Sequence, residues 1–211
     1  NGSSSLQQQK TSMNSSPFQV QSTILSLLDV NDDNDKFDST GYQTTFTEND
    51  AHLGIDITDN DVSIFNPDLF DMTTATFILT NKKLGDSLYV NGALEAGLTS
   101  TLVSTGNTLT LTVSGLKDST AYKNLLTQIQ FKNNRDDVDT TTRVINVTVA
   151  NTEGTSNIAQ SLIKVVNIND TVIVENESYT INEDTQLTNT LLSLLANDTD
   201  PDGDQISIQT I

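Results

Sequence analysis

The chain has 211 residues, of which 35% are apolar, and its 28 acidic and 10 basic side chains give a formal charge of −18. This composition allows one or two domains with a modest core, whereas the charge argues against a nucleic-acid partner, because phosphates attract Lys and Arg. No apolar run approaches the roughly 18 residues of a membrane span, so membrane insertion is not expected, and no cysteine is present for a disulfide or a thiolate metal site.

Residues 1–28 are predicted to be a leader or the end of a preceding module. Residues 1–22 are rich in Ser, Gln and Asn and lack the apolar centre of a signal peptide. We therefore expect the chain to be a piece of a longer protein.

The carboxylates are unevenly spread along the chain. Ten lie in residues 29–61 and nine in residues 170–204, which we call the first and second acidic segments. The two segments bracket a more neutral body, and this arrangement favours cations as partners.

The body between the acidic segments has an all-β pattern. Residues 108–113 and 145–149 alternate strictly between apolar and polar side chains, which predicts half-buried antiparallel strands. Residues 76–79, 87–90 and 161–168 are shorter candidates, and turn residues, among them Gly115, separate the predicted strands. Strands at this spacing without intervening helices indicate a β-sandwich.

One segment of the body departs from the strand pattern. An i, i+3, i+4, i+7 apolar pattern begins at Tyr122 and ends at Ile129, and Asp118 or Ser119 can cap its first turn. We expect a helix of about two turns across one end of the sandwich, with its apolar face in the core.

Two polar features of the body are interpreted as surface. The alternating threonines at 108, 110 and 112 are expected to form the outer face of a single strand, because the sequence shows no flat repeating array. Asp136, Asp137 and Asp139 are interpreted as a solvated loop.

The most informative stretch is the loop at residues 197–204, in which carboxylates occupy every second position and a glycine precedes the last. The carboxylates are Asp198, Asp200, Asp202 and Asp204. Such a loop repels itself unless a cation lies among its oxygens, and Ca²⁺ takes about six to eight oxygen ligands. Gln209 stands where an EF-hand has a bidentate Glu, and residues 205–208 alternate like a strand. A calcium loop that leads into a strand is therefore predicted, with a solvated acidic turn as the alternative.

Two internal self-similarities compete. Residues 23–28 resemble residues 190–195, which aligns the first acidic segment with the calcium loop. Alternatively, Asp29-Val30-Asn31-Asp32 aligns with Asn167-Ile168-Asn169-Asp170. Both alignments cannot describe one ancestral unit, so the chain is interpreted as containing parts of two related module types.

The acidic segments also carry a family resemblance. Residues 29–33 are similar to the Asp-x-Asn-Asp-Asn linker of cadherin repeats, and Phe37, Tyr42 and Glu48 follow at the spacing of such repeats. Residues 179–204 resemble the opening of cadherin-like repeats in giant bacterial surface adhesins of the RTX and biofilm-associated type. The resemblance implies an antiparallel Greek-key β-sandwich of the cadherin or Ig type with one short helix, in tandem with a partial neighbouring module.

This resemblance implies a division of the chain and a set of calcium ligands. A calcium-binding linker at residues 29–41 would precede a complete sandwich at residues 42–168, and residues 169–211 would form the next linker and the start of the next module. The implied ligands lie in the linkers, at the ends of first strands and in acidic turns: Asp29, Asn31, Asp32, Glu48, Asp59, Asp61, Asn169, Asp170 and Glu183, in addition to Asp198, Asp200, Asp202 and Asp204.

The expected function is that of a calcium-stabilised extender module of a large adhesin on the bacterial cell surface, involved in cell adhesion or biofilm formation. The alternative is a ligand-binding tip domain of such an adhesin, which would hold a sugar or a peptide, and an accessory domain of a secreted polysaccharide hydrolase comes third. Expected partners are calcium and neighbouring modules of the same chain, with cell-surface or matrix carbohydrate or protein as further candidates.

An enzyme is not expected. His52 is the sole histidine, and it lies in an acidic loop with no nucleophile motif nearby. Two positioned carboxylates would suffice for a glycosidase. However, acids clustered at module junctions fit metal binding better than a cleft, and a chain with 5% aromatic residues offers little surface for stacking sugars.

Overall fold

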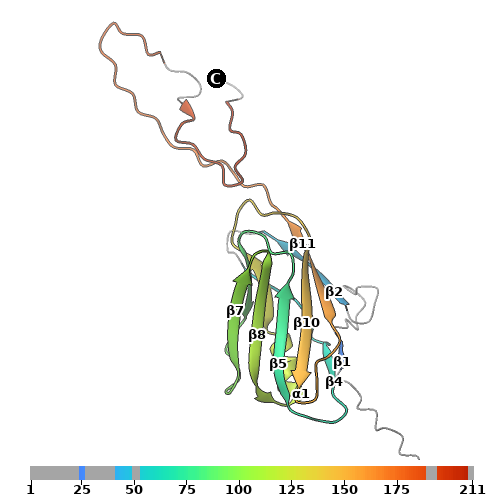
Figure 1. The fold of residues 1–211 in the computed structure, drawn as a ribbon. Helices are drawn as coiled ribbons and strands as arrows, with labels where there is room; N and C mark the ends of the chain where they lie inside the picture. The colour runs from blue at the N-terminus through green and yellow to red at the C-terminus, as the bar shows by residue number, and fades with distance from the viewer. Residues whose placement is uncertain (1–23, 27–40, 49–52, 189–193, 209–211) are drawn as a thin grey trace, which may run out of the picture.

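The computed structural model describes residues 24–26, 41–48, 53–188 and 194–208. Two sheets pack face to face as a sandwich, and the chain beyond it extends away from one end (Figure 1). The larger sheet contains, in spatial order, β2 (Gly41–Thr47), β11 (Ala159–Val166), β10 (Arg143–Asn151), β5 (Met72–Leu79), β8 (Thr108–Lys117) and β7 (Thr99–Thr105). The smaller sheet contains β3 (Ile55–Asp56), β9 (Ile129–Asn133) and β6 (Asp86–Val90), and a separate pair joins β1 (Ile24–Ser26) to β4 (Ser63–Phe65).

The predicted all-β sandwich is confirmed, and the alternating patterns explain its core. In β8, Leu109, Leu111 and Val113 are buried, whereas the threonines between them face outward. The five predicted strands correspond to β5, β6, β8, β10 and β11, although β11 ends two residues before the predicted end at Ile168. The strands pair antiparallel except β2, which runs parallel to β11. The sandwich is therefore closed at one side by two strands that point in the same direction.

The prediction of a turn at Gly115 is wrong, because this residue continues β8. Its φ of +151° is unfavourable for a side chain, and a Cβ there would lie 2.3 Å from the carbonyl oxygen of Gly97. The glycine is thus required by the close approach of the turn before β7 to the backbone of β8.

The predicted helix is α1 (Ser119–Leu126), and the side chain of Asp118 caps it by accepting a hydrogen bond from the backbone N–H of Ala121 at 2.8 Å. Tyr122, Leu125 and Leu126 face the core as expected. Ile129 differs from the prediction, because it begins β9 after a turn at residues 127 and 128.

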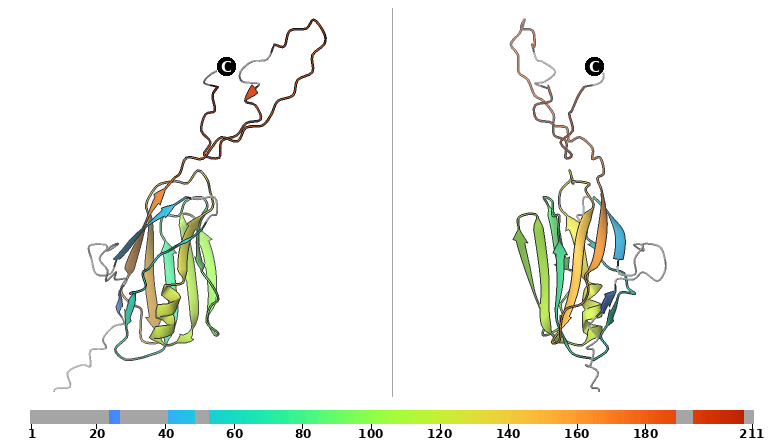
Figure 2. Two further views of the ribbon diagram at one scale, coloured as in Figure 1. Left: turned by 180° about the vertical axis from the view of Figure 1, so that it is seen from behind. Right: turned by 45° about the vertical axis from the view of Figure 1, so that its right-hand side comes forward.

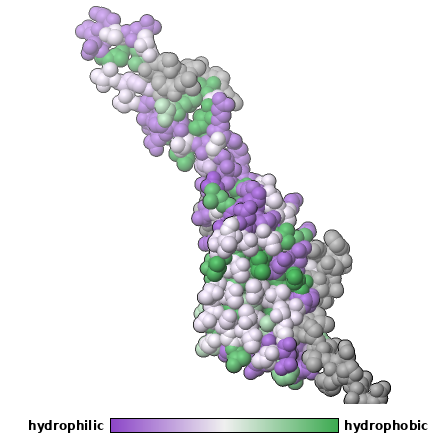
Figure 3. Space-filling view, viewed as in Figure 1, coloured by the Kyte–Doolittle hydropathy of each residue, from purple (hydrophilic) through white to green (hydrophobic). Residues whose placement is uncertain are grey.

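The threonines at 108, 110 and 112 form the outer face of β8, as predicted, but one of them also belongs to a row that crosses the sheet. Thr101, Thr112, Thr76 and Thr148 are direct neighbours across β7, β8, β5 and β10, so they form a row perpendicular to the strands. The corresponding face of the sandwich is mostly of intermediate hydropathy (Figure 3). The sequence did not show this array because each member comes from a different strand.

The segment beyond Asn167 has little regular structure. Its one strand-like contact within the described residues is a bridge between Ile173 and Thr199. The strand predicted after the acidic loop is not formed at residues 205–208. At the other end, β1 lies within the range assigned to a leader or a preceding module, yet it pairs with β4 of the sandwich.

Candidate metal centre at the end of the sandwich

Glu48 is placed by the parallel pair of strands. The residue follows β2, and its backbone N–H donates to the carbonyl of Val166 at 2.9 Å, at the end of β11. Only 3% of Glu48 is exposed. Because β11 leads directly into the linker, the pairing brings Glu48 to the point where Asp170 leaves the sandwich.

Asp136 reaches the same place from the loop between β9 and β10. Its carbonyl accepts a hydrogen bond from Val138 N–H at 3.1 Å, and Val138 packs into the core. One carboxylate oxygen each of Glu48, Asp136 and Asp170 lies within 4.8 Å of the others. Asp136 and Asp170 also line an open hollow of about 320 Å³ with Thr171, Ile173 and Pro201.

The donor set fits a hard cation. Two carboxylates about 4.8 Å apart repel by about 0.9 kcal/mol even at the dielectric of water, and by more where one of them is buried as Glu48 is. Ca²⁺ prefers carboxylate oxygens and accepts irregular geometry. Of the residues that the structure describes, these three form the one group of three or more such side chains close enough to share an ion.

A buried ion pair fixes the far side of the loop that carries Asp136. The guanidinium of Arg143 donates from Nε to Asp86 at 2.7 Å, and both side chains are fully buried. Asn133 donates to the same carboxylate at 2.8 Å, and Arg143 also donates to the carbonyl of Thr141. The loop therefore begins and ends on side chains that are anchored in the core.

Asp139 lies in this loop as well, and it forms an ion pair with Lys83 at 3.0 Å. Hydrogen bonds from Thr141, followed by the contact with Lys83, hold the pKa of Asp139 well below its usual range. Of the three residues interpreted as a solvated loop, Asp137 and Asp139 are exposed as expected. The interpretation missed the contacts of Asp139 and the place of Asp136 in the carboxylate group.

A side-chain amide joins the loop to the second acidic segment. Asn167 accepts a hydrogen bond from Val138 N–H at 3.0 Å, and its Nδ2 donates to Asp202 at 3.0 Å. The other oxygen of Asp202 accepts from the backbone N–H of Asp170 at 2.5 Å. Asp202 therefore lies beside the linker rather than in a separate loop of its own.

The remaining aspartates of the predicted calcium loop do not converge on one point. Asp200 accepts hydrogen bonds from the backbone N–H groups of Asp202 and Asp204, at 3.0 and 3.2 Å. Asp198 accepts from the N–H of Glu175 at 2.9 Å. These contacts describe a hydrogen-bonded turn, in which Gly203 adopts a φ of +77°. Calcium binding by this loop stays a prediction.

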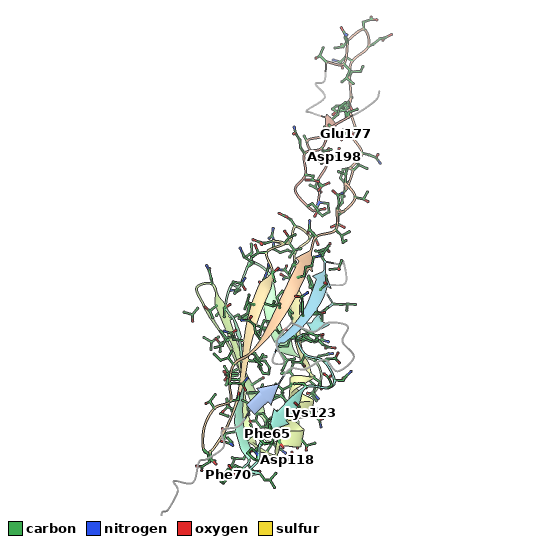
Figure 4. All side chains as sticks on the ribbon, turned by 90° about the vertical axis from the view of Figure 1, so that its right-hand side faces the viewer. Phe65, Phe70, Asp118, Lys123, Glu177 and Asp198 are labelled. Carbon is green, nitrogen blue, oxygen red and sulfur yellow. The ribbon has the colours of Figure 1, made fainter. Side chains whose placement is uncertain are left out.

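The other predicted ligands lie apart from the carboxylate group. Asp59 and Asp61 lie in the turn before β4, next to Thr58, which donates to the carbonyl of Leu126 in α1. Helix α1 is at the end of the sandwich opposite the second acidic segment (Figure 4). Asn169 donates to the carbonyl of Asp170, and Glu183 is exposed. The predicted ligands Asp29, Asn31 and Asp32 fall outside the described residues, as does His52.

The comparisons with known proteins concern the C-terminal segment. Residues 169–211 match the family model of a bacterial Ig domain. No curated protein and no solved structure matches the chain significantly. The match concerns the segment beyond the sandwich, and the sandwich itself is all-β with two packed sheets, as in an Ig-like fold.

Bacterial Ig-like domains are typically extracellular or exposed on the cell surface, where they act as structural repeats. The described part of the chain contains no helix with the length and apolar character of a membrane span. At this level, the match supports a structural repeat module of a bacterial surface protein.

Proposed function

We propose that the chain is a calcium-stabilised extender module of a bacterial surface adhesin and that it contributes to adhesion or biofilm formation. The observation that supports this most strongly is the convergence of Glu48, Asp136 and Asp170 where the sandwich meets the next segment. Each of these side chains belongs to a different part of the chain, so an ion held by all three cross-links β2, the loop before β10 and the linker.

Calcium would supply positive charge among carboxylates that otherwise repel one another. The chain's own residues do the positioning. Parallel pairing with β11 holds Glu48, and the buried ion pair of Arg143 and Asp86 holds the loop of Asp136. Asp202 holds the backbone N–H of Asp170, and Asn167 in turn donates to Asp202. An ion in this frame fixes the direction in which the chain leaves the sandwich.

Calorimetric titration with calcium tests the site in the intact chain. Glu48→Gln and Asp136→Asn are each expected to remove one bound ion or to weaken its binding at least about tenfold, because each removes a charged ligand. Asp68→Asn is the matched control, since Asp68 is an exposed carboxylate outside the group. Unchanged stoichiometry and affinity in both site variants would remove this centre.

The mechanical part of the proposal needs a distance measurement. The chain lacks cysteine, so Thr148→Cys in the sandwich and Thr180→Cys in the C-terminal segment accept spin labels cleanly. Pulsed electron paramagnetic resonance is expected to give a narrow distance distribution with calcium and a broad one with EDTA. Equal widths under both conditions would contradict the stiffening role.

A ligand-binding tip domain is the second candidate, and one observation favours it. Next to the proposed centre lies an open hollow of about 640 Å³ whose lining carries both charge signs, from Arg135, Asp137 and Asp139. Such a lining fits a polar ligand such as a sugar or a peptide. Binding of the wild-type chain to a glycan and peptide array tests this role, with the Arg135→Ala variant as the negative control. Equal signals from the wild type and the variant would exclude this hollow as the ligand site.

A further inference from the structure

Strand β7 is an edge strand of the larger sheet. Among the strands that the structure describes, it pairs with β8 alone, and it lies at the free side of the sandwich (Figure 1). All seven of its residues, Thr99–Thr105, are exposed, and its register with β8 is uninterrupted. Natural edge strands are commonly short, charged, bulged or interrupted by proline, which prevents pairing with another chain. The sequence Thr-Ser-Thr-Leu-Val-Ser-Thr carries none of these features.

The turn at the end of β7 determines which backbone groups face the free side. Gly106 and Asn107 form a two-residue turn that places Thr105 opposite Thr108 as the closing pair. In an antiparallel ladder, alternate residues direct both N–H and C=O to the same neighbour. The odd-numbered residues of β7 therefore bond to β8, and Ser100, Leu102 and Ser104 direct their backbone groups to the free edge.

The edge is self-complementary about Leu102. Read in either direction from this residue, the strand has Ser at the second position and Thr at the third. An antiparallel pair of two β7 strands related by a two-fold axis at Leu102 sets Ser100 of one copy opposite Ser104 of the other. Those are the residues whose backbone groups are available, so the hydrogen-bonding pattern and the two-fold symmetry agree.

Charge also favours a second copy at this edge. At −18 per chain, two copies repel wherever their carboxylates meet. At β7, Lys82 donates to Ser104 at 2.7 Å, and Glu95 is paired with Lys117 at 2.5 Å. Strand β7 itself contains no carboxylate. Two copies that approach through this edge therefore do not bring carboxylates of β7 against each other.

The side chain of Leu102 supplies an apolar contact at the symmetry axis. It is 48% exposed, and it lines an open hollow of about 450 Å³ between the sheets, together with Leu88, Leu94 and Leu111. In the symmetric pair, Leu102 of the second copy packs against Leu102 at the mouth of this hollow. Cross-strand apolar pairs of this kind stabilise antiparallel sheets.

We propose that β7 is a self-association surface, through which a second copy of this chain extends the six-stranded sheet across a two-fold axis. A single pair of strands is smaller than the interfaces of tight complexes, so the association is weak between free molecules. Copies held on one surface meet at a high effective concentration, which strengthens such contacts without any additional interface. This surface does not depend on calcium binding at the other site.

Sedimentation velocity over about 0.01–1 mM protein tests the proposal, because weak dimers with Kd values up to about 1 mM are populated in this range. The wild-type chain is expected to form dimers. Leu102→Lys and Leu102→Glu should each weaken dimerisation at least about tenfold, since like charges then face each other at the axis. Ile158→Lys is the control, because Ile158 is 61% exposed in the loop before β11, far from β7 in strand order.

Mixing the two charged variants identifies the register. Leu102→Lys and Leu102→Glu proteins should form a heterodimer when combined, because only residue 102 faces its own copy in the proposed pair. A wild-type chain that stays monomeric up to about 1 mM would overturn the proposal. So would a dimer that persists in both single variants, or variants that fail to associate when mixed while circular dichroism shows them folded.

Discussion

The sandwich and the segment that leaves it are stabilised by different interactions. In the sandwich, Phe77, Leu126 and Ile145 are fully buried in one continuous core. In the C-terminal segment, Ile173, Val174 and Ile181 are each more than half exposed. There the observed contacts include a backbone bridge between Ile173 and Thr199 and hydrogen bonds to aspartates, and the segment projects from the sandwich in every view (Figure 2). Burial thus stabilises the sandwich, whereas the segment is held by hydrogen bonds to acidic side chains, where we propose that ions act.

The largest expected loss of stability comes from breaking the buried ion pair of Arg143 and Asp86. Asp86→Ala leaves the Arg143 guanidinium buried without its carboxylate, which should cost about 3–5 kcal/mol in unfolding free energy. Denaturant unfolding measures it. The double variant Asp86→Leu with Arg143→Met should recover much of the loss, because it removes the unpaired charge. If the single variant unfolds at the wild-type midpoint, the sandwich does not depend on this pair.

Truncation of a core side chain tests whether apolar burial stabilises the sandwich. Leu126→Ala should lower the unfolding free energy by about 2–5 kcal/mol, because Leu126 is fully buried in α1. Its calcium affinity should equal that of the wild type, since α1 is at the opposite end from the carboxylate group. A change in affinity together with stability would show that the two ends are coupled.

Calcium should act on the junction and not on the sandwich. Extracellular modules bind calcium with Kd values of about 0.1–1 mM, so about 10 mM ion would add about 1.4–2.7 kcal/mol by mass action. Hydrogen exchange is expected to slow about 10- to 100-fold at the amides of Asp170 and Val138, which bond to Asp202 and Asn167. Amides of β5 serve as the internal reference. Equal slowing at both places would mean that the ion stabilises the whole module.

The smallest expected effect is a pH dependence in the sandwich alone. Burial raises the pKa of Tyr122 to about 12, and its hydroxyl donates to the carbonyl of Gly115 at 2.8 Å. A raised folded-state pKa stabilises the neutral phenol, so this contribution is complete below about pH 10 and is lost as the pH rises towards about 12. Tyr122→Phe should therefore reduce the difference between denaturation midpoints at about pH 9 and pH 11. An unchanged difference would assign the alkaline loss of stability to other groups.

The parts of the fold that sequence could predict are those with a local signal. Strict alternation located β8 and β10, and the Asp118 cap located the start of α1. Strand β7 had no such signal, because an edge strand with both faces exposed shows no apolar alternation. The threonine row was hidden for a related reason, since pairing between distant strands creates it.

The candidate site was predictable only in part. Glu48 and Asp170 were marked by their linker-like surroundings, and the structure brings them together. Asp136 joins them only because long-range contacts of Val138 and Arg143 fold its loop towards the linker. At the aspartates of residues 198–204 the sequence signal is clear, but the structure does not bring their side chains together around one point. Their spacing predicts a cation, but backbone N–H groups can satisfy the same carboxylates, as they do for Asp200.

The parallel pairing of β2 with β11 has a mechanical consequence. The ladder joins seven residue pairs, from Gly41 opposite Gln160 to Thr47 opposite Val166. A force that pulls Gly41 and Val166 apart acts along the strand axes in opposite directions, so it shears the ladder and loads all its hydrogen bonds together. A hairpin pulled at its open end would instead separate one bond at a time. Forced unfolding depends on the height of the unfolding barrier, and simultaneous rupture raises that barrier, so this pair of strands makes the sandwich resistant to tension along the chain.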